Sequence, residues 1–189
     1  MKKLLEIFII TFVCWSCSYI PERYLDITEF RIVDRNGSTV ASCAELSVVF
    51  YKGVSLKDVS DSLGCDNGYG SIMYELLQIL DKTERINGVS VNFSRSFKVV
   101  FLKNQKQLNI MMKSRDRAYN DDPENLLAFY DDNINSVFVC IETLSLSLLV
   151  HEFTHMIQDR MNFKLNESQK EAMAYKAEET YKRIYGMQR

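Results

Sequence analysis

The feature that most constrains this chain is the segment at residues 148–158, which reads Leu-Leu-Val-His-Glu-Phe-Thr-His-Met-Ile-Gln. The chain has two histidines, and both lie in this segment. On an α-helix, His151 and His155 fall one turn apart on the same face, so both imidazoles can reach one metal ion. Glu152 projects from a neighbouring face, where it can accept a proton from a metal-bound water instead of coordinating the metal. The segment therefore predicts a metal-binding helix with a general base beside the metal.

The flanking residues favour a buried helix. Thr143 or Ser145 can cap its start. Apolar residues leave no fully polar face, and they are Leu144, Leu148, Leu149, Val150, Phe153, Ile157 and Met161. The alternative is a pair of core histidines bonded to backbone carbonyls. Two buried imidazoles with a buried glutamate between them are costly without a partner, so the metal-binding interpretation is favoured.

This segment resembles the active-site helix of zincin metallopeptidases, which are built on His-Glu-x-x-His. The resemblance implies a Zn²⁺ cofactor and hydrolysis of peptide bonds by a zinc-activated water, with Glu152 as general base. Zinc in such sites takes three protein ligands and leaves a fourth position for water. The chain has no further histidine, so the gluzincin branch, whose third ligand is a downstream glutamate, is the one implied.

Glu171 is the third ligand that the resemblance implies. Glu171-Ala-Met-Ala-Tyr175 is similar to the segment that carries this ligand in the gluzincin branch. Ser168-x-x-Glu171 also has the pattern of a capping box, in which Glu171 would bond the start of the helix instead. Glu178 and then Glu167 are the alternative ligands, because they fall on roughly the same helical face.

Two supporting roles in this branch have no obvious occupant here. The branch often has an aspartate where Tyr175 stands, and this aspartate holds a ligand histidine. The candidates for that orienting role are Gln158, Asp159 and Glu178. A second donor to the oxyanion is also usual in the branch. The candidates for this donor are Tyr175, Tyr181 and Tyr130, of which Tyr175 is taken as the predicted catalytic residue.

The N-terminus has the pattern of an export signal. Lys2 and Lys3 precede an apolar run at residues 7–15 that is too short to span a bilayer. The Cys14-Trp-Ser-Cys17 segment resembles a bacterial lipoprotein signal, which is cleaved before a cysteine that then carries lipid. This implies a lipid on Cys17, with Cys14 as the alternative, and anchoring to a bacterial membrane outside the cytoplasm, facing the periplasm or the surface. A plain secretory signal or an uncleaved apolar N-terminus are the other interpretations.

The predicted organisation is a signal peptide at 1–17, a tether at 18–28, a β-rich extension at 29–70 and a zincin-like domain at 71–189. Composition excludes a nucleic-acid partner, since the chain has 23 basic and 25 acidic residues and no basic stripe. In an oxidising compartment Cys43 and Cys65 could form a disulfide, whereas Cys140, in an apolar strand, is expected to be a core thiol.

The expected fold class is α+β, in which a helix backs a mixed sheet and the active-site helix precedes the third-ligand helix. Helices are predicted at residues 56–63 and at 71–84, the second capped by Ser71. An Asn-Gly pair at 36–37 predicts a hairpin. Strands are expected at residues 29–34, 39–42, 45–52, 89–93, 97–102, 108–112, 126–130 and 137–141. The acidic stretch at 113–125 fits no calcium-loop template and is expected to be a solvated loop.

The main competing hypothesis is a non-catalytic, zincin-like lipoprotein that binds a partner, with zinc serving stability alone. Glu152 weighs against it, because a structural zinc site needs no base. Hydrolysis of another substrate, such as a cell-wall peptide or an ester, would use the same residues. In a peptidase, an exposed edge strand at 126–130 or 137–141 could bind an extended peptide by strand addition.

Overall fold

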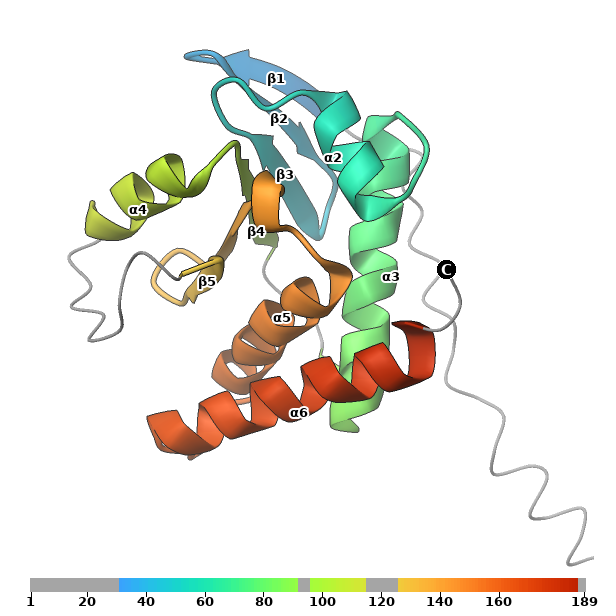
Figure 1. Ribbon diagram of the computed structural model, residues 1–189, viewed down its shortest axis with the longest axis vertical. Coiled ribbons are helices and arrows are strands. Elements are labelled where there is room, and N and C mark those ends of the chain that lie inside the picture. The colour runs from blue at the N-terminus through green and yellow to red at the C-terminus, as the bar shows by residue number, and fades with distance from the viewer. Residues whose placement is uncertain (1–30, 92–95, 115–125, 187–189) are drawn as a thin grey trace, which may run out of the picture.

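The computed structural model describes residues 31–91, 96–114 and 126–186 (Figure 1). These residues form one six-stranded mixed sheet and five α-helices, so the predicted α+β class is confirmed. In chain order the elements are β1 (Arg31–Arg35), β2 (Ser38–Ser42), β3 (Leu46–Phe50), α2 (Leu56–Leu63), α3 (Tyr69–Asn87), β4 (Phe97–Leu102), α4 (Gln105–Lys113), β5 (Ala128–Asp131), β6 (Ser136–Cys140), the 3-10 turn η1 (Ile141–Thr143), α5 (Leu146–Arg160) and α6 (Glu167–Tyr185).

The strands lie in the order β1-β2-β3-β4-β6-β5. β1, β2 and β3 are antiparallel, β3, β4 and β6 are parallel, and β5 returns antiparallel to β6. The N-terminal strands therefore belong to the main sheet rather than to a separate one. The predicted hairpin is confirmed, because Asn36 and Gly37 both adopt the positive φ that a tight two-residue turn requires. β5 is left at the edge of the sheet, beside α5.

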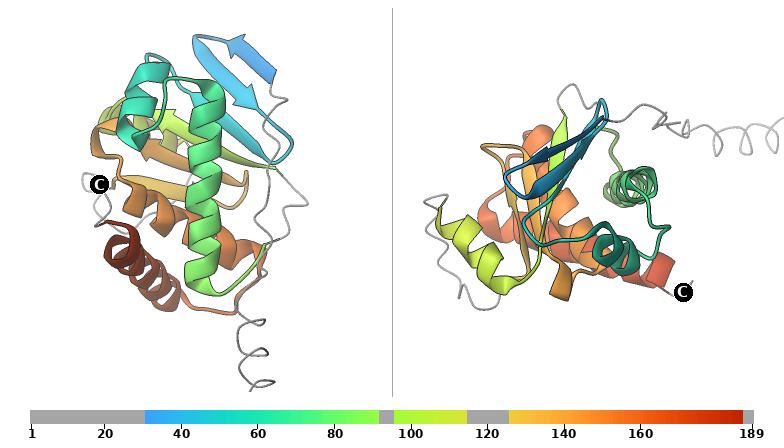
Figure 2. Two further views of the ribbon diagram at one scale, coloured as in Figure 1. Left: turned by 90° about the vertical axis from the view of Figure 1, so that its right-hand side faces the viewer. Right: turned by 90° about the horizontal axis from the view of Figure 1, so that it is seen from above.

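Helices cover the two faces of the sheet unequally (Figure 2). Successive residues of a strand point to opposite faces. In β4, Phe97, Val99 and Phe101 join the larger core under α2, α3, α5 and α6, while Val100 and Leu102 join a smaller core under α4. The candidate site thus lies on the heavily covered face, where α5 packs against α3, α6 and β5.

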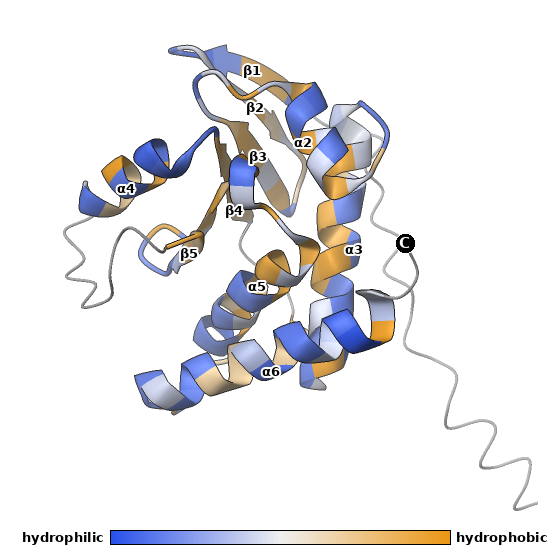
Figure 3. Ribbon diagram, in the orientation of Figure 1, coloured by the Kyte–Doolittle hydropathy of each residue, from blue (hydrophilic) through white to orange (hydrophobic). Residues whose placement is uncertain are grey.

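The two C-terminal helices differ sharply in character (Figure 3). α5 has ten buried residues among its 15, and Ser145, rather than Thr143, caps it by accepting a hydrogen bond from the Leu148 N–H at 3.1 Å. α6 is largely hydrophilic, and the residues it buries are Ala174, Ala177 and Tyr181. Two of these three are small, so α6 can approach α5 closely.

The predicted strand at 108–112 is wrong, because these residues belong to helix α4. Asn104 caps that helix by accepting a hydrogen bond from the Gln107 N–H at 3.1 Å. Leu108 and Met112, one turn apart, are buried against the sheet, whereas Ile110 is 55% exposed. The buried positions therefore follow a helical period. The Asn104 cap and this period together favour a helix over the strand that the apolar residues alone would suggest.

Two other predicted features differ from the structure. Residues 89–91 lie outside any strand, and the last two residues of the strand predicted at 89–93 lie outside the described ranges. The Val91 N–H donates to the Glu84 carboxylate at 3.2 Å instead of joining a ladder. α3 begins at Tyr69 with Gly68, not Ser71, as its N-cap, because the chain already turns into the helix after Gly68.

No disulfide joins Cys43 to Cys65, so the bridge that the sequence allowed between them is not formed. Cys43 and Cys65 both pack against the larger core as apolar side chains. The signal peptide and tether, with Cys14 and Cys17, lie outside the described residues, as does most of the acidic stretch at 113–125. Among the helices of the described residues, none combines the length and the apolar character needed to cross a membrane.

Candidate metal centre

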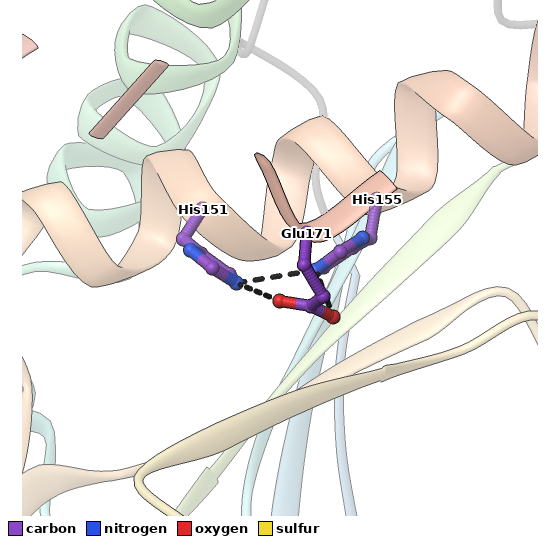
Figure 4. A group of neighbouring side chains, drawn as sticks. All are labelled: His151, His155 and Glu171. Atoms are coloured by element: carbon purple, nitrogen blue, oxygen red, sulfur yellow. Dashed lines mark hydrogen bonds and ion pairs between the residues drawn. The ribbon is translucent and has the colours of Figure 1, made fainter. Parts of the chain in front are cut away.

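α5 and α6 together bring three ligand-type side chains to one point (Figure 4). His151 and His155 come from successive turns of α5, and their Nε2 atoms lie 3.1 Å apart. Glu171, from the first turns of α6, places Oε2 at 3.4 Å from His151 Nε2 and Oε1 at 3.4 Å from His155 Nε2. Each pair of these side chains is therefore in contact.

The spacing of these atoms fits a tetrahedral ion. Zinc bonds to histidine nitrogen and carboxylate oxygen are about 2.0–2.2 Å long, which places neighbouring tetrahedral ligand atoms about 3.3 Å apart. The two Nε2 atoms are 3.1 Å apart and each lies 3.4 Å from a different oxygen of Glu171, and one ligand atom from each residue lies within 4.8 Å of the others. Side chains of this kind at this spacing could hold a metal ion.

The remaining ring nitrogens show which way each imidazole presents its lone pair. The Gln158 amide donates from Nε2 to the Lys170 carbonyl at 2.8 Å, and because a carbonyl only accepts, its Oε1 faces His155 Nδ1 at 3.0 Å. His155 Nδ1 therefore carries a proton. His151 Nδ1 lies 3.5 Å from Glu178 Oε2, an acceptor, which favours a proton on this nitrogen as well. In the neutral rings both Nε2 atoms present lone pairs to each other.

Facing lone pairs beside a carboxylate demand a positive charge between them. Burial and the neighbouring His155 lower the pKa of His151. Burial also acts to lower the pKa of His155, but the hydrogen bond to Glu171 and the charges of Glu152 and Glu171 raise it above its usual value. The same hydrogen bond lowers the pKa of Glu171. The electrostatics thus favour a cation at the Nε2 atoms, either a proton or a metal ion.

Glu152 is buried beside this cluster and is not one of its three converging side chains. Burial raises the pKa of Glu152 to about 7, although the positive charge of His155 and a hydrogen bond from the Tyr130 backbone act in the opposite direction. A carboxyl group with this pKa can accept and return a proton near neutral pH. The contact with Tyr130 also places Glu152 next to the edge strand β5.

Of the three glutamates considered as third ligand, Glu171 is the one that reaches both Nε2 atoms. The side chain of Glu167 is 83% exposed and pairs with Lys170 at 2.6 Å. Glu178 contacts the opposite nitrogen of His151. The capping box of α6 is formed by Asn166 and Gln169 rather than by Ser168 and Glu171, so Glu171 is not used as a cap.

The three candidate tyrosines have different surroundings. The Tyr175 ring packs edge-on against His151, with centroids 4.8 Å apart, and is 59% exposed. The Tyr130 hydroxyl faces two acceptors, Asp159 at 3.0 Å and Asn135 at 3.2 Å, and not the cluster. Tyr181 is buried in the core and packs against Tyr185. Tyr175 is therefore the candidate that lies at the cluster.

Sequence reasoning missed two residues that surround Glu178. Its Oε1 lies 2.9 Å from Lys182 Nζ and 3.4 Å from Ser147 Oγ. The i,i+4 spacing of Glu178 and Lys182 is a signal for such an ion pair and could have been noted. No sequence signal marks Ser147, because its contact depends on how α6 lies across α5.

The fold and these contacts define a site of two histidines and one carboxylate, of a kind that could hold a metal ion. No protein-family model matches the chain, and neither the curated proteins nor the solved structures contain a match to it. Functional assignment therefore depends on the chemistry of the site.

Proposed function

We propose that the protein is a zinc-dependent metallopeptidase of the zincin type, in which His151, His155 and Glu171 hold the metal. The observation that carries this proposal is the meeting of two imidazole nitrogens and one carboxylate within ligand distance of one another, with the buried Glu152 carboxyl beside them. The sheet supports the zincin assignment, because a long helix, α3, backs a mixed sheet before the two ligand-bearing helices.

A zinc ion held by these three side chains would lower the pKa of a water in its fourth position and polarise the scissile carbonyl. Glu152 accepts a proton from the attacking water as the new C–O bond forms. It returns that proton to the nitrogen of the leaving amine when the C–N bond breaks. The backbone N–H of Tyr130 holds the carboxylate in place for both transfers. In this proposal the Tyr175 hydroxyl donates to the oxyanion.

Strand β5 is the strand that contacts Glu152. It pairs with β6 along one edge, and no described strand pairs with its other edge. The Tyr130 N–H points away from β6, toward Glu152, so the unpaired edge faces the site. All four residues of β5 are buried, so this edge is covered and not exposed as the sequence predicted. In this proposal the protein acts outside the cytoplasm and is anchored to a bacterial membrane by a lipid on Cys17.

The test is hydrolysis of a mixture of fluorogenic peptides by the zinc-loaded protein and by two variants. Glu152→Gln should keep one zinc per chain and lose about 10²–10⁴-fold in rate, because the proton acceptor is gone. Tyr175→Phe, which keeps the ring against His151, should lose about 10²–10³-fold in kcat if the hydroxyl serves the oxyanion. Full activity in Glu152→Gln would remove Glu152 from the reaction. An inactive wild-type protein with tightly bound zinc would instead favour a partner-binding role.

A further inference from the structure

We propose that Glu178 is a positioning residue that fixes His151 in the tautomer with a free Nε2. This inference rests on the metal site of the proposed function. It goes beyond that proposal by assigning a role to a carboxylate that does not contact the converging atoms. The observation behind it is the 3.5 Å approach of Glu178 Oε2 to His151 Nδ1, on the side of the ring away from Glu171.

Both oxygens of Glu178 have defined partners. Oε2 faces His151, while Oε1 lies 2.9 Å from Lys182 Nζ and 3.4 Å from Ser147 Oγ. Lys182 and Ser147 are donors to Oε1, so the carboxylate cannot rotate without losing them. The side chain of Glu178 is 18% exposed, compared with 49% for Lys182. A shielded carboxylate held in this way presents a fixed acceptor to Nδ1–H.

The helical repeat explains how one helix serves both ends of the His151 ring. Glu171 and Glu178 are two turns apart on one face of α6, about 10 Å along its axis. Glu171 reaches back to Nε2, Glu178 reaches Nδ1, and Tyr175, between them in sequence, packs against the ring. His155 differs, since Gln158 of its own helix sets its tautomer. The correct tautomer of His151 therefore depends on α6.

These contacts predict an unusual effect of the isosteric Glu178→Gln substitution. Lys182 and Ser147 both donate toward this end of the side chain, so the amide oxygen should turn toward them. The amide nitrogen then faces His151 Nδ1, which must accept a hydrogen bond and loses its proton. The proton moves to Nε2 and occupies the position that the metal needs. Loss of the negative charge of Glu178 would not by itself change the His151 tautomer, because the change requires the amide nitrogen as a donor to Nδ1.

The experiment reads the tautomers directly by two-bond ¹H–¹⁵N correlation spectra of metal-free, histidine-labelled protein at a pH where both rings are neutral. The chain has two histidines, so two ring systems appear. In the wild type both should be protonated at Nδ1, and in Glu178→Gln the His151 signals should change to the Nε2–H pattern while His155 stays unchanged. Zinc affinity, measured by chelator competition, should fall about 10–100-fold.

Glu179→Gln is the matched control. Glu179 is the next residue of α6 and also pairs with Lys182, at 3.0 Å, but its side chain is 72% exposed. It should change neither the tautomer nor zinc affinity. The double variant Glu178→Gln/Lys182→Met should recover part of both, because the amide oxygen can then face His151. If Glu178→Gln does not fold, Glu178→Asp, which keeps the charge but is shorter, should weaken zinc binding while retaining the Nδ1–H tautomer.

An unchanged His151 tautomer together with unchanged zinc affinity in the Glu178 variants would overturn the positioning role. Equal losses in Glu179→Gln would overturn it too, because they would point to the net charge of α6 rather than to a specific contact. Neither result would affect the metallopeptidase proposal, which fails instead if the wild type binds no zinc or hydrolyses no peptide. The tautomer measurement uses metal-free protein and remains decisive in that case.

Discussion

In the proposed zinc protein, removal of the metal should loosen α6 selectively. Of the 19 residues in this helix, the buried ones are Ala174, Ala177 and Tyr181. Burial of two methyl groups and one aromatic ring contributes about 3–4 kcal/mol, whereas α5 buries ten residues against the sheet and α3. Elements with so little apolar burial open at a lower free energy than the rest of a domain. α6 is therefore expected to be the C-terminal element that opens most readily in the metal-free protein.

A metal ion bound by both helices raises the free energy of that opening. His151 and His155 belong to α5 and Glu171 to α6, so opening α6 removes one of the three ligands. At a free zinc concentration of 100 times Kd, the bound state gains about 2.7 kcal/mol over a state that does not bind. Amide exchange in α6 should then slow about 100-fold. Exchange in α4, on the opposite face of the sheet, should not change.

The assay is hydrogen–deuterium exchange, resolved by peptide, of the metal-stripped and the zinc-loaded protein. Glu171→Gln should abolish the slowing in α6, because the link between the helices is lost. Glu167→Gln is the control, since Glu167 is exposed and pairs with Lys170. Equal slowing in α4 and α6 would indicate that zinc stabilises the whole fold rather than the helix pair. No slowing in the wild type at saturating zinc would refute the bridging geometry.

Two further predictions concern the support of the site. Phe153 is fully buried and packs edge-on against Phe97, with ring centroids 5.9 Å apart. Phe153→Ala should therefore lower the free energy of unfolding by about 3–5 kcal/mol, measured by urea denaturation. A loss below about 1 kcal/mol would contradict this packing. Burial and the nearby Asp159 raise the pKa of Tyr130 well above 10 in the folded protein. The stabilisation that the protonated Tyr130 hydroxyl gives the fold is therefore complete below the ordinary tyrosine pKa of about 10, and it is lost as the pH rises further. Absorbance titration at 295 nm should show one tyrosine that ionises last, and Tyr130→Phe should remove it.

The part of the site that lies within one helix could be predicted from the sequence. The spacing of His151 and His155, the position of Glu152 between them and the Ser145 cap depend on the helical repeat alone. Glu171 could be proposed from its resemblance to a family pattern, although Glu178 and Glu167 lay on roughly the same face. The choice among them depends on how α6 lies across α5, which no local pattern encodes. The approach of Glu178 to Nδ1 could not be predicted for the same reason.

The fold was predictable where local signals agree and not where they conflict. The hairpin at Asn36 and Gly37 follows from positive φ angles and was predicted correctly. α4 was predicted as a strand because its apolar residues also suit a sheet. The competing signals were the Asn104 cap and the one-turn spacing of Leu108 and Met112. Whether this run lies beside the sheet or within it depends on the pairing of β4 with β6, which is a long-range contact.

The distribution of charge between the two helices explains why the site favours a cation. α5 supplies two imidazoles and the buried Glu152, and α6 supplies two carboxylates, from Glu171 and Glu178, at the two ends of the His151 ring. Docking α6 therefore gathers negative charge around rings whose Nε2 atoms already present lone pairs. Lys182 offsets part of the charge at Glu178, but it lies on the Nδ1 side of His151. On the Nε2 side, the negative charge of Glu171 can be neutralised by a proton on His155 or by a divalent ion. Of these two, the ion is the one that can contact all three side chains at once.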